Sequence, residues 1–86
     1  LYLAFNAVHT PMQADDARLA KFSNVADKTR RTHNAMLLAM DEAIGQVRKK
    51  VADAGLEQNT LVFFCSDNGG PTMPGVTVNG SKNDPL

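Results

Sequence analysis

Two short apolar runs on either side of one long amphipathic pattern constrain the fold of this chain more than any other feature. The runs cover Leu1 to Asn6 and Thr60 to Ser66, and both are continuous rather than alternating. Continuous apolar strands of this length are typical of parallel sheets that helices cover on both faces. We therefore expect each run to form a buried strand.

The segment between the two runs carries the pattern of a single long helix. Asp27 is a good N-cap and Gly55 is a good stop, which predicts a helix of about 27 residues and ~40 Å. Gly45 inside this helix weakens it, so we expect a closely packed neighbour there. The order strand, helix, strand predicts a right-handed βαβ unit of an α/β protein. The apolar stripe of the helix consists of Met36, Leu37, Met40, Ile44, Val47 and Val51.

Charge and composition exclude several classes of protein. Nine basic residues balance nine acidic ones, so the chain has no bulk field that would attract nucleic acid. No apolar run approaches the ~20 residues of a membrane span, and the single cysteine excludes a disulfide framework. The chain starts at Leu1 within an apolar run, and we expect it to be an internal piece of a larger domain.

The βαβ topology places two polar peptides at one edge of the expected sheet. His9 follows the first run and Asp67-Asn68 follows the second, and parallel strands end at the edge where α/β proteins bind ligands. Asp67 and Asn68 offer hard oxygen ligands for Ca²⁺ or Mg²⁺, and His9 can donate a proton or hold an anionic oxygen. An ordinary turn and a surface histidine are the alternatives, and the residues alone leave both open.

The other polar or reactive residues have simpler interpretations. Cys65 ends an apolar run and is expected to be a small buried hydrophobe rather than a nucleophile. His33 lies beside the apolar stripe, where packing or capping explains it. Most prolines and glycines fall between Asp67 and Leu86, so this stretch is expected to be a loop. It includes Asn79-Gly80-Ser81, a match to the N-glycosylation acceptor pattern.

Three ordered motifs resemble the sulfatase family, and more closely its arylsulfatases within the alkaline-phosphatase-like superfamily. They are LYLAFNAVHTPMQ, a long helix containing AMDEAIG, and NTLVFFCSDNGG followed by NGSKNDPL. The similarity covers nearly the whole chain. It implies that residues 1–86 are part of a sulfatase catalytic domain built on a large mixed sheet. The nucleophile region and the C-terminal part of that domain are expected to lie outside these residues.

The resemblance also implies roles for individual residues. His9 matches the family's active-site histidine, which contacts the sulfate ester and can protonate the leaving oxygen. Asp67 and Asn68 match the second pair of calcium ligands in the family's Asp-Asn-Gly motif. Lys82 does not inherit the sulfate-binding lysine, which follows a Pro-Leu-Arg-Gly sequence, because Lys82 precedes Pro85-Leu86. The motif that matures to formylglycine, the family's nucleophile, is absent from these residues.

The implied function is hydrolysis of a sulfate ester, carried by a small molecule or a sulfated glycan. Oxygen-only ligands fit Ca²⁺, whereas the related phosphatases favour zinc with histidine ligands. A phosphonate or phosphoester hydrolase of the same superfamily is one alternative, and a noncatalytic module in which Asp67-Asn68 is only a turn is another. By analogy with the family, the protein is expected in the periplasm or the extracellular space. The 86 residues alone are expected to be inactive.

Overall fold

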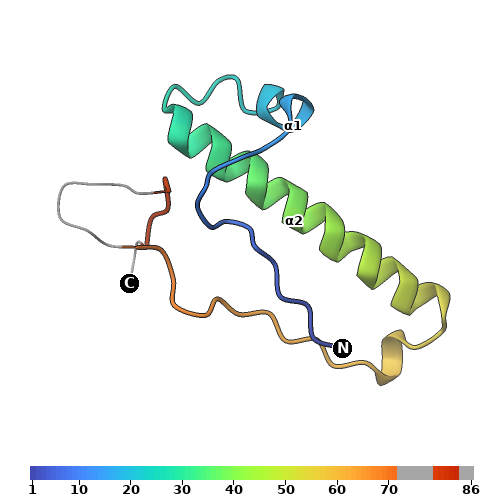
Figure 1. Cartoon of the computed structure of the whole chain (residues 1–86). Coiled ribbons are helices and arrows are strands. Elements are labelled where there is room, and N and C mark those ends of the chain that lie inside the picture. The colour runs from blue at the N-terminus through green and yellow to red at the C-terminus, as the bar shows by residue number, and fades with distance from the viewer. Residues whose placement is uncertain (72–78, 84–86) are drawn as a thin grey trace.

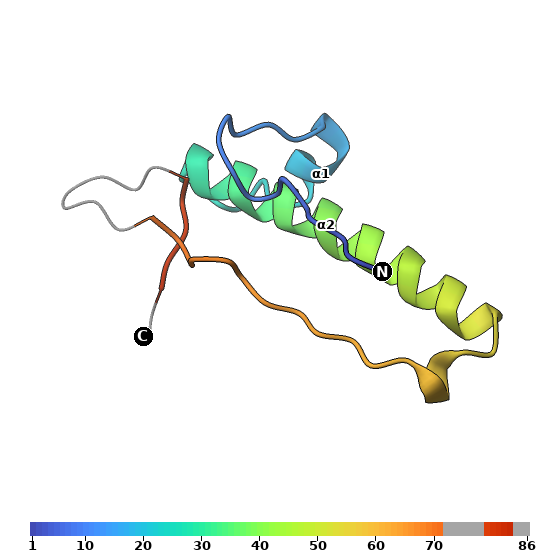
Figure 2. The same cartoon turned by 60° about the horizontal axis from the view of Figure 1, so that its bottom comes forward.

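The computed structural model describes residues 1–71 and 79–83, and its regular structure is helical (Figure 1). The elements are α1 (Asp16–Ala20), α2 (Lys28–Asp53) and the short 3-10 helix η1 (Glu57–Asn59). The chain before α1 crosses α2, and the chain after η1 runs back along it (Figures 1 and 2). Within the described residues, no helix combines the length and the apolar character needed to cross a membrane.

Helix α2 confirms the predicted long helix at nearly the predicted bounds. It contains 26 residues, and the carboxylate of its N-cap Asp27 accepts a hydrogen bond from the Arg30 amide at 2.7 Å. Past its C-terminal end, Gly55 adopts a φ of 68°, a conformation that favours glycine. Local capping and periodicity are therefore sufficient to define this element.

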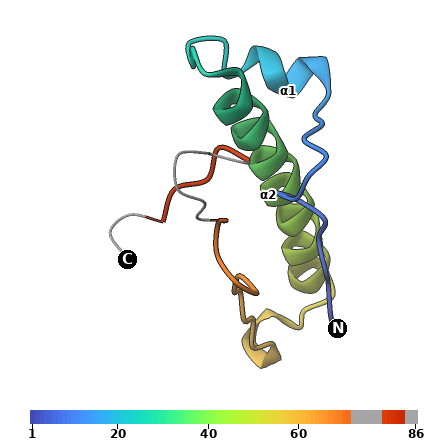
Figure 3. The ribbon, with the colours of Figure 1, turned by 60° about the vertical axis from the view of Figure 1, so that its left-hand side comes forward.

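The predicted βαβ unit is wrong for the part of the chain that the structure describes. Neither Leu1 to Asn6 nor Thr60 to Ser66 forms a strand. Both runs go back along α2 in the same direction, but they lie apart from each other (Figures 2 and 3). A strand requires hydrogen bonds from a neighbouring backbone, and the two runs do not provide them for one another.

The apolar side chains of the second run are exposed as a consequence. The exposed fractions of Leu61, Phe63 and Phe64 are 78%, 85% and 73%. Cys65 is exposed as well, so the prediction that it is buried is wrong. In the part of the chain that the structure describes, the buried hydrophobic residues are Ala35 and Met36, both in the first half of α2.

Helix α1 was not predicted, and polar contacts hold it against α2. Its N-cap Asp15 accepts a hydrogen bond from the Arg18 amide at 3.0 Å. The Arg18 guanidinium also bonds the Glu42 carboxylate of α2, and this bond lowers the pKa of Glu42 below its ordinary value. The contact is therefore present at neutral pH and is lost as the pH falls through that lowered pKa.

The expected packing partner of Gly45 is not found among the described residues. A Cβ built on Gly45 would meet no atom within 4 Å. The cost of glycine in a helix interior, about 1 kcal/mol relative to alanine, is therefore not offset by a close contact in this structure.

Candidate functional site

His9 lies on an exposed turn whose hydrogen bonds define the proton positions of its ring. The His9 amide donates to the Asn6 carbonyl at 2.8 Å, and the ring Nδ1 lies 2.7 Å from the Thr10 carbonyl oxygen. Because a carbonyl only accepts hydrogen bonds, Nδ1 must carry a hydrogen. Nε2 is then the nitrogen that gains or releases the second proton, which is the arrangement an acid catalyst requires.

Asp67 and Asn68 form an exposed turn that presents two oxygen-bearing side chains. Gly69 has a φ of 71°, and its amide donates to the Ser66 hydroxyl oxygen at 3.0 Å. The side-chain nitrogen Nδ2 of Asn68 lies 3.5 Å from a carboxylate oxygen of Asp67. This geometry is that of a turn, and it leaves the side chains of Asp67 and Asn68 exposed.

The donor chemistry at Asp67 and Asn68 fits a hard cation, but the donor number is incomplete. Ca²⁺ takes about 6–8 oxygen ligands, and a carboxylate and an amide oxygen are of the preferred type. Within residues 1–71 and 79–83, no group of three or more His, Cys, Asp or Glu side chains is placed to hold a metal. These two residues can therefore supply only part of a coordination shell.

No hydrogen bond joins His9 to Asp67 or Asn68 in the described part of the chain, and a third peptide links their two loops. Residues 79–83, called here the bridging segment, start beside the first turns of α2 and run away from the helix toward the chain after Ser66 (red in Figure 2). One end of this segment bonds the loop of His9, and the other end bonds the turn of Asp67 and Asn68.

Asn79 is the residue that reaches the histidine loop. Its side chain donates from Nδ2 to the Val8 carbonyl at 3.2 Å, and its Oδ1 accepts from the Ser81 amide at 3.0 Å. The backbone carbonyl of Asn79 accepts from Nδ1 of His33 at 2.9 Å. Asn79 is only 8% exposed, so its side-chain amide and its backbone carbonyl are both held by hydrogen bonds inside the structure.

Gly80 brings the bridging segment into direct contact with α2. Its φ is 76°, and a Cβ added there would lie 3.0 Å from the Cα of Arg30. The Arg30 guanidinium donates to the Gly80 carbonyl. Only glycine meets both the conformation and the close approach to the helix backbone.

Asn83 holds the turn that carries Asp67 and Asn68. Its Oδ1 accepts from the Gly70 amide, and its Nδ2 donates to the Gly70 carbonyl, both at 3.0 Å. The side-chain amide thus bonds Gly70 as a neighbouring peptide would. A Cβ on Gly70 would lie 2.2 Å from the Ser81 hydroxyl oxygen, so the contact requires glycine.

The described residues of the stretch from Asp67 to Leu86 form no helix or strand, as predicted, but part of this loop is buried. Asn79 and Gly80 are buried, although they belong to no helix or strand. N-glycosylation at the Asn79-Gly80-Ser81 pattern would attach a glycan to Nδ2 of Asn79. In this structure Nδ2 donates a hydrogen bond to the Val8 carbonyl. Residues 72–78 and 84–86 of the predicted loop lie outside the described residues.

His33 is a packed residue, as predicted, but its bonding partner was not foreseen. It is 6% exposed and lies on the helix beneath Asn79. Burial lowers the pKa of His33 below its ordinary value of 6.5; the bond to Asn79 opposes this shift, and the positive charge of Arg30 adds to it. Nδ1 donates to Asn79 in either protonation state, and burial beneath the bridging segment favours the neutral ring.

Acidification is expected to loosen the bridging segment. Because the folded state disfavours protonated His33, its contribution to stability is complete above about pH 6.5 and is lost as the pH falls through the lowered pKa. Hydrogen exchange of residues 79–83 in the full-length protein, corrected for intrinsic rates, should be faster at about pH 5 than at about pH 7.5. His33→Gln keeps a donor without titrating, so it should remove the pH dependence. An equal dependence in His33→Gln would contradict this account.

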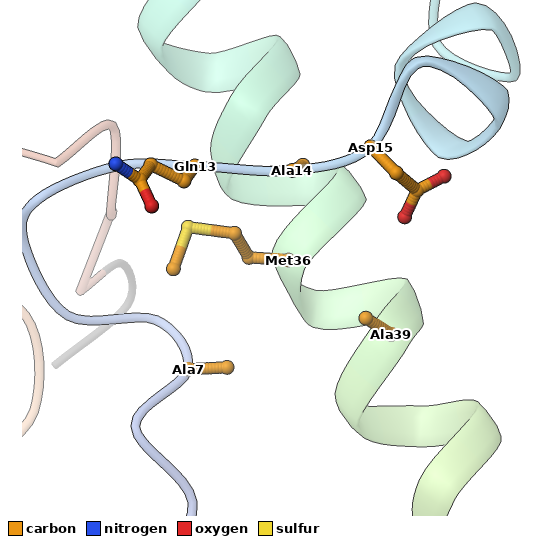
Figure 4. A pocket seen from close by; sticks show the side chains of 6 residues that line it. All are labelled: Ala7, Gln13, Ala14, Asp15, Met36 and Ala39. Atoms are coloured by element: carbon orange, nitrogen blue, oxygen red, sulfur yellow. The ribbon is translucent and has the colours of Figure 1, made fainter.

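A shallow hollow lies between the N-terminal loop and α2 (Figure 4). Its volume is about 390 Å³, and Met36 and Ala39 contribute its helical wall. Asp15 is its charged residue, and that carboxylate already bonds Arg18. The hollow therefore lacks the convergent polar groups of a ligand site.

Comparisons with known proteins relate this arrangement to one family. The family model described as Sulfatase matches residues 1–85. Mouse arylsulfatase J (Mus musculus) is 38% identical over 85 residues, which cover 95% of this chain and 14% of that protein. An uncharacterized sulfatase of Escherichia coli strain K12 is 30% identical over 84 residues, with coverage of 95% and 15%.

A third relative differs in the substrate that its name states. Mouse N-acetylgalactosamine-6-sulfatase (Mus musculus) is 28% identical over 82 residues, which cover 95% of this chain and 15% of that protein. The chain thus spans about one seventh of the length of these three relatives. No solved structure matches the chain significantly.

Proposed function

Because this chain belongs to the sulfatase family, we propose that it is part of the catalytic domain of a sulfuric ester hydrolase of the arylsulfatase type. The observation that carries the proposal is the family match over residues 1–85, supported by a named arylsulfatase at 38% identity. The substrate is a sulfate ester of a small molecule or a glycan. The nucleophile, formylglycine by resemblance to the family, belongs to another part of the same protein.

In this proposal His9 acts on the leaving oxygen of the ester. Cleavage of the S–O bond leaves negative charge on that oxygen, and a proton from Nε2 of protonated His9 neutralises it. The bond from Nδ1 to the Thr10 carbonyl orients the ring and leaves Nε2 as the nitrogen that transfers a proton. General acid catalysis of this kind contributes about 10²–10⁴-fold to the rate.

Asp67 and Asn68 are proposed to hold Ca²⁺ through one carboxylate and one amide oxygen. A bound divalent cation would stabilise the charge that builds up on the sulfate oxygens. The turn at Gly69 keeps both side chains exposed, and Asn68 in place of a histidine favours calcium over zinc. Export to the periplasm or the extracellular space belongs to the same proposal and rests on analogy with the family.

The full-length protein is expected to hydrolyse p-nitrophenyl sulfate in a calcium-dependent way. Release of nitrophenolate should stop when EDTA removes the metal and return when Ca²⁺ is restored, because the charge on the sulfate oxygens then regains its counter-ion. The isolated 86 residues serve as the inactive control. Faster hydrolysis of p-nitrophenyl phosphate or a phosphonate ester would favour the related hydrolases, and no turnover of any of these esters would favour a noncatalytic module.

A further inference from the structure

The bridging segment has a position that the proposed roles of His9, Asp67 and Asn68 do not explain. Its five residues contact three separate parts of the chain: the histidine loop, the first turns of α2, and the turn after Ser66. The contacts with the two loops are made by amide side chains, which donate and accept at the same time. The bridging segment therefore attaches both loops to the start of α2.

The bond from Asn79 acts on the backbone directly before His9. Its acceptor, the Val8 carbonyl, belongs to the peptide that leads into His9. Asn79 is itself held from two sides, by the Ser81 amide on its Oδ1 and by His33 on its carbonyl. Asn79 therefore links the histidine loop to α2 through hydrogen bonds to both.

The bond pair from Asn83 acts on the backbone directly after the Asp67-Asn68 turn. Gly70 is bonded through both its amide and its carbonyl, so it cannot rotate about the turn without breaking two hydrogen bonds. The Ser81 side chain occupies the space that a Cβ on Gly70 would fill, so the bridging segment approaches the turn closely in the same place. The turn is thus attached to the same five residues as the histidine loop.

We infer that Asn79 and Asn83 are positioning residues that hold the histidine loop and the Asp67-Asn68 turn in fixed relation to each other through residues 79–83. This inference rests on the proposed function for its catalytic consequences. Neither asparagine touches the substrate or the metal in this scheme. Each acts through a peptide next to a residue that does, and displacement of a reacting group by about 1 Å costs on the order of 10²-fold in rate.

The two substitutions Asn79→Asp and Asn83→Asp test this inference in the full-length protein. Each keeps the shape and the accepting oxygen but replaces the donating nitrogen by an oxygen that repels a carbonyl. We expect Asn79→Asp to lower kcat about 10- to 100-fold with KM and calcium affinity nearly unchanged. Because the new carboxylate of Asn83→Asp would itself attract a cation, calcium affinity is measured in the uncharged variant Asn83→Leu, which also removes both bonds to Gly70. We expect Asn83→Leu to weaken calcium binding, measured by calorimetry on the metal-free protein, by about 10- to 100-fold.

Hydrogen exchange separates a failure of the inference from a failure of the proposed function. Asn79→Asp should accelerate exchange in residues 6–11 but not in residues 66–70, and Asn83→Asp should do the reverse. Asn59→Asp, at an exposed position in η1, is the matched control and should change none of these quantities. If the wild-type protein hydrolyses no sulfate ester, the proposed function fails, yet the exchange pattern still tests the positioning.

Unchanged exchange and unchanged catalysis in both variants would overturn the inference. The same conclusion would follow if either variant loosened both loops equally, because general unfolding, rather than loss of one attachment, would then explain the effect. Loss of activity in Asn79→Asp with normal exchange of residues 6–11 would also contradict it.

Discussion

Replacing Asp67 by asparagine in the full-length protein is expected to weaken calcium binding by roughly 100-fold or more, because the change removes a negative charge from a hard-cation site. Turnover at limiting calcium should fall by a similar factor, and excess calcium should restore part of it. The substitution keeps nearly the same size and the same preference for turns. Calorimetry for calcium and initial rates with p-nitrophenyl sulfate would measure the two effects.

The same substitution distinguishes a metal ligand from a simple turn. If Asp67 only ends a turn, its replacement at this exposed position should change the free energy of unfolding by well under ~1 kcal/mol and leave the rate intact. Asp53→Asn, at an exposed position near the end of α2, is a charge-matched control that should leave calcium affinity unchanged. Normal calcium content and a normal rate in Asp67→Asn would end the metal assignment.

His9→Ala is expected to lower turnover without changing calcium binding, unlike Asp67→Asn. Turnover should fall by about 10²–10⁴-fold because the leaving oxygen loses its proton donor. Calcium content should not change, because imidazole is a poor ligand for calcium. The loss should be smaller for p-nitrophenyl sulfate than for an alkyl sulfate, since nitrophenolate is a stable anion and needs less help from an acid.

Gln13→Ala provides the control for His9→Ala, because Gln13 is exposed and lies in the same N-terminal loop. It should leave both turnover and the dependence on the leaving group unchanged. If His9→Ala slowed aryl and alkyl sulfates by the same factor, His9 would act in binding rather than as the acid.

The features predicted correctly from the sequence are those defined by neighbouring residues. Asp27 and Gly55 lie at the two ends of α2, and the caps and the apolar period between them are local signals. Helix α1 was missed because it has only five residues, and its contact with α2 depends on Arg18 reaching Glu42, 24 positions away.

The features that the sequence did not reveal depend on partners far along the chain. The strands predicted at Leu1 to Asn6 and Thr60 to Ser66 were inferred from composition, but a strand exists only where another backbone bonds to it. The bridging segment was missed for the same reason. Its bonds join residues separated by 13, 46 and 71 positions, and no local pattern marks such pairs.

The bond between Asn79 and Val8 also has a consequence for the order of events during synthesis. Because its partners are 71 residues apart, the ribosome must add most of this region before the loop of His9 can be anchored. At ~5–20 residues per second this interval is on the order of ten seconds, whereas a helix such as α2 forms within about a microsecond. The nascent chain therefore carries an unanchored histidine loop throughout this interval, together with a finished helix once Asp53 has been added. Proteases and chaperones would encounter the unanchored loop during this interval. The exposure would end once the bridging segment has left the ribosome and Asn79 can bond Val8.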